Sequence, residues 1–227
     1  MLDANLVAYQ ALADDYRVTS PKRLGHAARW LPNSLLEPIP GERALDIGCA
    51  DGSHAFLLAE FGYDVTAVDF SPRMIGHART RAEQGTGSRP AFLEGEFLTG
   101  KFRDDVGDLV TLAPDFHLVV ANAFVHLFPS PVDAEVVGTA LGLVAPGGAA
   151  LFSTTVEDSR TEDFLGKSLM DGTVVERWRG RYPRTDFVDL ISGVAGDGFE
   201  ISHLPSTDMR DKPWVTVVAR RRADRRG

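Results

Sequence analysis

The chain has 227 residues, 44% of them apolar, which suits one medium-sized domain with a full core and does not require two. Its formal net charge of −8 argues against nucleic-acid partners, whose backbone is bound by Lys and Arg. No apolar run approaches the roughly 20 residues that span a bilayer, so we expect no membrane partner. The one cysteine, Cys49, excludes an internal disulfide, and the first residues carry no secretory signal, so we expect a cytoplasmic protein.

The N-terminal part of the sequence is expected to be helical. Apolar residues at helical spacing predict helices over residues 4–16 and 21–36, and the Pro-rich joint 37–42 follows them.

Beyond this joint, short apolar runs typical of buried strands alternate with helical patterns. The expected strands are residues 44–47, 64–68, 91–93, 116–121, 149–155, 199–204 and 214–220. The expected helices are residues 53–61, 71–83, 131–144 and 185–195. The second of these begins with Ser71-Pro72, a capping residue followed by a proline suited to the first helical position. Residues 156–182 show a less regular pattern.

This alternation predicts an α/β, doubly wound fold, with a mostly parallel seven-stranded sheet and helices on both faces. Only about ten residues separate the last two strands, too few for a helical crossover. We therefore expect the last strand to be antiparallel and inserted at the edge of the sheet. Ligands of such sheets bind at the carboxyl ends of the strands.

A glycine-containing turn follows the first expected strand, in the stretch RALDIGCADGSH (43–54). A dinucleotide fingerprint would need its last glycine one residue later than Gly52, and Asp46 and Asp51 would crowd a pyrophosphate. No Gly-Lys-Ser/Thr follows, which argues against a nucleotide P-loop. The turn therefore favours a positively charged ligand without phosphate over a nicotinamide cofactor.

At this point the sequence resembles the class I (Rossmann-like) S-adenosylmethionine-dependent methyltransferases. The stretches that carry the resemblance are ALDIGCADGSHAFLLAE (44–60), VTAVDFSP (65–72), EGEF (94–97), FHLVVANAFVHLFP (116–129) and APGGAALFST (145–154). They occur in the family's order and spacing. One departure is Ala50, where the family often has glycine.

The resemblance implies one methyltransferase domain in four parts. These are an N-terminal helical lid (1–38), a cofactor-binding core (40–155), a substrate-side insertion (156–182) and a C-terminal helix with two strands (183–220).

The resemblance also implies S-adenosyl-L-methionine as the cofactor and places residues around it. Asp46, Gly48 and Gly52 belong to the motif at its methionine end. Asp69 would accept hydrogen bonds from the ribose hydroxyls, and Glu96 from the adenine amino group. Phe70 and Met74 would lie beside the adenine, and Phe97 would contact it through its backbone N–H. The remaining implied contacts are Tyr16 on the lid, Ala50 and Asn122.

The candidate catalytic residue is His126, as a general base. Asn122 and His126 are four residues apart at the start of an expected helix, so they should share the face that looks into the crevice. The alternative is a histidine that only bonds backbone beside the cofactor. The basic stretch 176–184 could bind a carboxylate or a phosphate, or form a solvated surface.

Several substrate classes are disfavoured by missing motifs. The fourth strand is not followed by N/D-P-P-Y/F, which argues against amino-methylation of DNA bases or glutamine, and no acid cluster indicates a metal site. The expected function is methyl transfer to a small-molecule O or N nucleophile, with specialised metabolism as a candidate setting. The alternatives are a methyltransferase of peptide N- or C-termini and a non-catalytic protein that binds S-adenosylmethionine.

Overall fold

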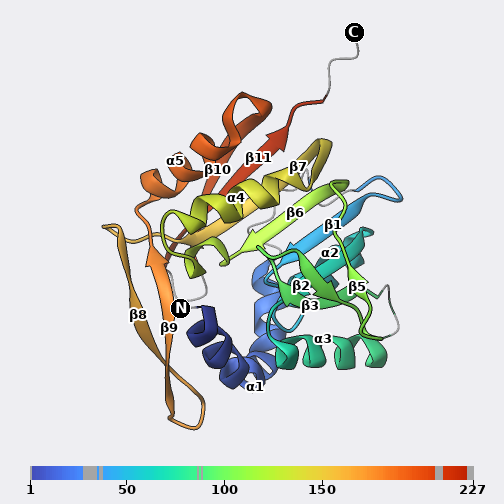
Figure 1. The fold of residues 1–227 in the computed structure, drawn as a ribbon, viewed down its shortest axis with the longest axis vertical. Helices are drawn as coiled ribbons and strands as arrows, with labels where there is room; N and C mark the ends of the chain where they lie inside the picture. Colours follow the sequence, from blue (N-terminus) through green and yellow to red (C-terminus); the bar gives the residue numbers. More distant parts are fainter. Residues whose placement is uncertain are drawn as a thin grey trace.

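The structure is a computed structural model that describes residues 2–27, 35, 38–85, 87, 89–207 and 212–223. Its larger sheet has the strand order β10-β11-β7-β6-β1-β2-β3-β4-β5 (Figure 1). The strands of its central part are β1 (Arg43–Ile47), β2 (Asp64–Asp69), β3 (Ala91–Glu96), β6 (Phe116–Asn122) and β7 (Val144–Thr155). These five pair in parallel, as the alternation of strands and helices predicts.

The C-terminal edge of the sheet confirms the expected antiparallel insertion. Its strands are β10 (Phe199–Thr207) and β11 (Pro213–Arg221). β11 lies between β10 and β7 and is antiparallel to both. The short connection between β10 and β11 leaves no room for a crossover helix.

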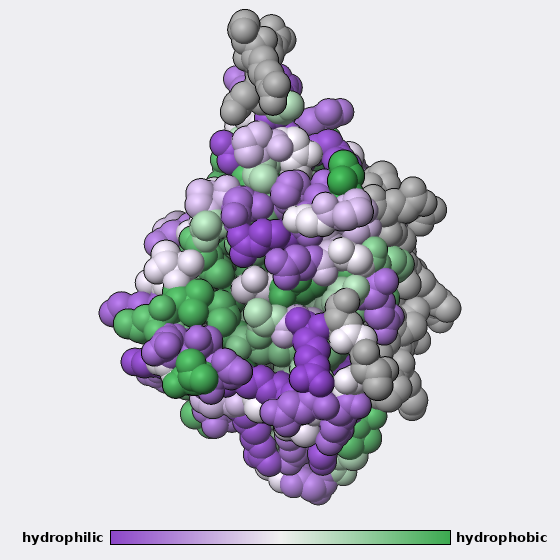
Figure 2. All heavy atoms as spheres, turned by 90° about the vertical axis from the view of Figure 1, so that its right-hand side faces the viewer, coloured by the Kyte–Doolittle hydropathy of each residue, from purple (hydrophilic) through white to green (hydrophobic). Residues whose placement is uncertain are grey.

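The opposite edge is longer than expected, so the sheet has nine strands where the sequence predicts seven. Two short strands, β4 (Lys101–Arg103) and β5 (Leu109–Val110), extend it; β4 is antiparallel to β3, and β5 is antiparallel to β4. Strands of three and two residues are too short to show a period, which is why the sequence does not reveal them. Figure 2 views the molecule from the right-hand side of Figure 1, where β5 lies, and shows apolar surface interspersed with polar groups.

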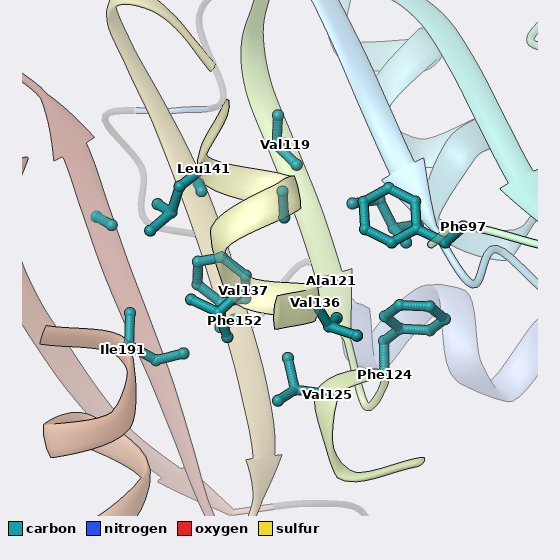
Figure 3. Packing of buried hydrophobic residues seen from close by; sticks show 14 of the residues in the cluster. Phe97, Val119, Ala121, Phe124, Val125, Val136, Val137, Leu141, Phe152 and Ile191 are labelled. Atoms are coloured by element: carbon teal, nitrogen blue, oxygen red, sulfur yellow. The ribbon is translucent and has the colours of Figure 1, made fainter. Parts of the chain in front are cut away.

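Helices cover both faces of the sheet and bury a separate core on each. α2 (Ser53–Phe61) and α3 (Pro72–Gln84) pack on one face, and α4 (Val132–Gly142) and α5 (Arg184–Ala195) on the other. Neighbouring residues of β1 alternate between the two cores, as the two-residue period of a strand requires. Figure 3 shows side chains of β6 and β7 meeting those of α4 and α5 in the second core.

The predicted start of α3 is confirmed at the level of single atoms. The Ser71 hydroxyl accepts a hydrogen bond from the backbone N–H of Met74, and Pro72 occupies the first turn of the helix.

The N-terminal region forms one helix, α1 (Leu2–Ala27), where the sequence predicts two. Residues 17–20, between the two expected helices, are themselves helical, and α1 continues past Pro21 to Ala27. Half of the second expected helix, residues 28–34 and 36, lies outside the described residues.

Residues 156–182 are more regular than expected. They hold a two-stranded antiparallel sheet of β8 (Thr161–Ser168) and β9 (Val174–Arg181). This hairpin extends away from the main sheet beside α1 (Figure 1). Charged residues interrupt the alternation in both strands, which hides the pattern, although the turn at Asp171-Gly172 is a hairpin signal. Within the described residues, no helix combines the length and apolar character needed to cross a membrane.

Candidate cofactor and substrate site

A pocket opens at the carboxyl ends of β1, β2, β3 and β6, where the fold class predicts a ligand site. It is lined by Asn5, Gly48, Val68, Asp69, Phe70, Gly95, Glu96, Phe97, Phe124, Leu127 and Phe128. Five of the residues expected to bind the cofactor are therefore in its wall, namely Gly48, Asp69, Phe70, Glu96 and Phe97. Phe97 and Phe124 form an edge-to-face pair with ring centroids 5.8 Å apart (Figure 3).

The turn after β1 brings its backbone close to the pocket. Gly48 and Gly52 have φ values of +70° and +79°, and Ala50 adopts a left-handed φ of 50° despite its side chain. A Cβ atom at Gly48 would lie 2.5 Å from a ring carbon of Phe124, so only glycine fits there. The backbone N–H groups of Gly48 and Cys49 both donate to the carbonyl of Val68, which fixes the turn against β2.

Asp46 supplies a buried negative group beneath this turn. Its side chain is 1% exposed, and its Oδ2 atom is buried without a hydrogen-bond partner among the described residues. Burial and the nearby carboxylate of Asp69 raise the pKa of Asp46 to about 7. An unpaired buried carboxylate oxygen is costly, and a bound cation would relieve that cost. This orphaned oxygen fits a cationic group such as the α-ammonium of S-adenosylmethionine.

Asp69 is held in place at the end of β2. One carboxylate oxygen accepts from the backbone N–H of Ala50 and the other from that of Ser71, each at 2.9 Å. Burial raises the pKa of Asp69 to about 6, although these N–H groups oppose the shift. Each oxygen keeps a further lone pair. The carboxylate is therefore pre-oriented to accept two hydroxyl groups from a ligand in the pocket.

Residues 44–148 match the family model described as a methyltransferase domain. This match assigns residues 44–148 to the methyltransferase family. The match spans the turn after β1, the end of β2, and β3 and β6, which together form the pocket.

Individual relatives of this methyltransferase carry related names. It is 29% identical over 188 residues to a ubiquinone biosynthesis O-methyltransferase from Azorhizobium caulinodans, over 81% of this chain and 66% of that protein. It is 34% identical over 144 residues to a protein of the same name from a Caulobacter species, over 62% of this chain and 50% of that protein. The chain thus spans between half and about two thirds of the length of these curated relatives.

The solved structure of the DhpI–SAH complex shares the methyltransferase fold. It superposes on 98% of this chain and 97% of its own with a TM-score of 0.71, at 17% sequence identity.

The remaining residues expected at the cofactor lie around the pocket and do not line it. Met74 is fully buried at the start of α3, and Asp46, Ala50 and Gly52 belong to β1 and the turn behind the wall. Asn122 ends β6 and accepts a hydrogen bond from the Ser153 hydroxyl. Tyr16, on α1, packs edge to face on Tyr9, with ring centroids 6.3 Å apart.

The expected helical relation of Asn122 and His126 is wrong. Asn122 is the last residue of β6, whereas His126 lies in a short 3-10 helix, η2 (Val125–Leu127). Ala123 between them has a left-handed φ of 53°, which turns the chain and breaks the regular spacing.

His126 itself is buried next to the pocket residue Leu127. Its side chain is 1% exposed, and Nδ1 lies 2.8 Å from the hydroxyl of Thr154. Burial, and then the charges of Arg179 and Arg177, hold the pKa of His126 well below its usual range. The imidazole is therefore neutral at neutral pH, and a proton added to it is disfavoured while the two guanidinium groups lack a counter-charge.

Asn5 is a site residue that the sequence reasoning missed. This buried side chain lines the pocket, donates to the carbonyl of Leu127 and accepts from the backbone N–H of Trp178 at 2.7 Å. It thereby links α1, η2 and β9. The sequence signal for it is helical spacing: Asn5 lies three residues before Ala8 and seven before Leu12, so it is a polar residue on the buried face of α1.

Proposed function

We propose that this chain transfers a methyl group from S-adenosylmethionine to an oxygen or nitrogen nucleophile of a small molecule, in specialised metabolism. The observation that carries the proposal is the unpartnered carboxylate oxygen of Asp46 beneath the glycine turn of the pocket. Curated relatives named as O-methyltransferases favour oxygen as the accepting atom.

In this proposal the cofactor supplies an electrophilic methyl group, and the protein supplies binding and position. Asp46 would attract the ammonium group electrostatically from behind the pocket wall, Asp69 would hold the ribose hydroxyls, and Glu96 would hold the adenine amino group. Phe70 and Phe97 would form apolar walls. Because the leaving group is already good, most of the catalysis can come from holding the nucleophile close and in line. We further propose that His126 receives the proton of the nucleophile, since it lies beside the pocket residues of η2 and is neutral at neutral pH.

A thermal-shift comparison tests the proposed cofactor. S-adenosylmethionine and S-adenosylhomocysteine, at about 100 times their dissociation constants, should stabilise the fold by about 2.7 kcal/mol, whereas NAD should have no effect. A shift with NAD and none with the other two would overturn the proposal. Formation of S-adenosylhomocysteine with phenol, amine or carboxylate acceptors then separates an enzyme from a protein that only binds the cofactor.

Cofactor binding should also depend on pH through Asp46. Its folded pKa of about 7 lies above the ordinary value of 3.8, so the stability that protonation gives the free protein is present below about pH 4 and is lost as the pH rises through 7. An ammonium ligand needs the ionised carboxylate. The affinity for S-adenosylhomocysteine should therefore rise about tenfold between about pH 6 and about pH 8.

Calorimetry on three proteins checks this dependence. Asp46→Asn should lower the affinity and flatten its pH profile, leaving the smaller change in the same direction that Asp69 contributes. Asp64→Asn replaces an exposed carboxylate at the end of β2 that is remote from the pocket, and it should behave like the wild type. A steep profile retained by Asp46→Asn would contradict this role.

A further inference from the structure

Two arginines of β9 form a charged cluster beside the cofactor pocket. Arg177 and Arg179 are two residues apart on one strand, so their side chains project from the same face. Arg177 donates to the hydroxyl of Tyr9 at 2.9 Å, and Arg179 donates to the hydroxyl of Thr155 at 2.9 Å. Both side chains are half-buried.

This cluster lacks a counter-charge. Within the described part of the chain, neither guanidinium is within ion-pair distance of a carboxylate, and the buried Nε atom of Arg177 has no hydrogen-bond partner. Burial and the neighbouring charge of Arg177 lower the pKa of Arg179, and the acid that acts on it, Glu157, forms no ion pair with it. The two positive groups therefore repel each other at a half-buried position.

Arg160 shows how the same protein pairs another partly buried arginine. One of its guanidinium nitrogens lies 2.8 Å from Asp133 and 2.6 Å from Glu162. Half-buried arginines are ordinarily compensated in this way. Among the residues that the structure describes, Arg177 and Arg179 depart from that pattern, which makes them candidates for pairing with an anionic ligand.

The cluster adjoins the site proposed for methyl transfer. Tyr9 packs edge to face on Phe70, a pocket residue, with ring centroids 6.2 Å apart. Asn5, one turn earlier on α1, lines the pocket and binds β9 between the two arginines, at the backbone N–H of Trp178. The charges of both arginines also reach His126. A molecule held by this cluster would lie next to the cofactor.

We propose that the methyl acceptor is a small molecule with an oxyanion group, a carboxylate or a phosphate, and that Arg177 and Arg179 bind this group with the hydroxyl of Tyr9. The proposal rests on the proposed function, because it names the substrate class of the same site. Guanidinium groups match both anions by paired hydrogen bonds, and the tyrosine hydroxyl adds a neutral donor. The oxyanion would also supply the missing counter-charge next to His126.

The test measures binding of simple probes to protein saturated with S-adenosylhomocysteine, in a buffer free of phosphate. Benzoate and phenyl phosphate represent the two anions, and benzamide is the uncharged control. At least one anion should bind about 10- to 100-fold more tightly than benzamide, and the stronger of the two identifies the group. Equal binding of all three probes would overturn the proposal.

Substitutions then locate the anion. Arg177→Gln and Arg179→Gln should each weaken the preferred anion about 10- to 100-fold while leaving the affinity for S-adenosylhomocysteine unchanged, which also shows that each variant is folded. Arg177→Lys, which keeps the charge, should lose less. Arg184→Gln removes a charge of the same basic stretch from an exposed position and should bind as the wild type does. Wild-type affinity in both Arg177→Gln and Arg179→Gln would refute the site.

The two proposals fail in different ways. If S-adenosylhomocysteine does not bind to the wild type, the proposed function is wrong, and the anion probes are then measured on the free protein. If it binds and the anions do not, only the substrate class is wrong.

Discussion

Replacing Asp69 with alanine is expected to weaken binding of S-adenosylmethionine by roughly 1.5–3 kcal/mol, because the ligand loses hydrogen bonds from two hydroxyls to a charged acceptor. The orientation of the carboxylate makes this loss large. Its two oxygens are held by the backbone N–H groups of Ala50 and Ser71, so the free protein has already met the cost of positioning it.

The same two contacts predict a second effect of Asp69→Ala. Two backbone N–H groups lose their acceptor, so the melting temperature of the ligand-free protein should fall as well. Calorimetry and thermal unfolding of Asp69→Ala, Asp69→Asn and the exposed control Asp64→Ala separate the effects. Asp69→Asn keeps one oxygen acceptor and should retain more affinity than alanine does. Unchanged affinity in Asp69→Ala would exclude the ribose role.

The largest effect on rate is expected at His126. If it receives the proton of the nucleophile, His126→Ala should lower turnover by about 10²–10⁴-fold while the affinity for the cofactor stays nearly unchanged. The loss should shrink as the pH rises, because the substrate then sheds its proton unaided. A bound oxyanion should ease the reaction, since it offsets the charges of Arg177 and Arg179 that oppose protonation of the imidazole.

Single-turnover rates and cofactor affinities across about pH 6 to about pH 9 distinguish the two roles of His126. His203→Ala, which removes an exposed histidine of β10, is the matched control and should be silent. A parallel fall of rate and affinity with no pH signature would assign His126 a supporting role through Thr154. A full rate at every pH would remove it from the reaction, and proximity alone would then account for the catalysis.

The parallel core of the fold could be predicted from the sequence because its local signals agree with one another. The apolar run of β6 has no other stable place than between two covered faces, and Ser71-Pro72 marks the start of α3 by its capping chemistry. The carboxyl ends of adjacent parallel strands meet at one edge, so the positions of Gly48 and Asp69 in the pocket wall followed from the topology.

The turn after β6 and the β8–β9 hairpin could not be predicted as well, for two physical reasons. The backbone at Ala123 is left-handed although the residue is not glycine, and tertiary packing imposes such a conformation without a local signal. The β8–β9 hairpin carries some charged residues that face solvent and others that contact the rest of the protein. The sequence pattern alone does not distinguish the two kinds. The basic stretch could thus be noticed, but the pairing of Arg177 with Tyr9 depends on contact with α1.

The position of Asn5 has a consequence for the order of events in a catalytic cycle. The Asn5 side chain belongs to the pocket wall and also joins α1 to η2 and β9 by hydrogen bonds. The wall cannot open at that place while both hydrogen bonds are intact. Lifting α1 to let a spent cofactor leave would also carry Tyr9 away from Arg177. Release of the cofactor and release of the methylated product would then share one gate, and the rate at which α1 detaches would set an upper limit on turnover.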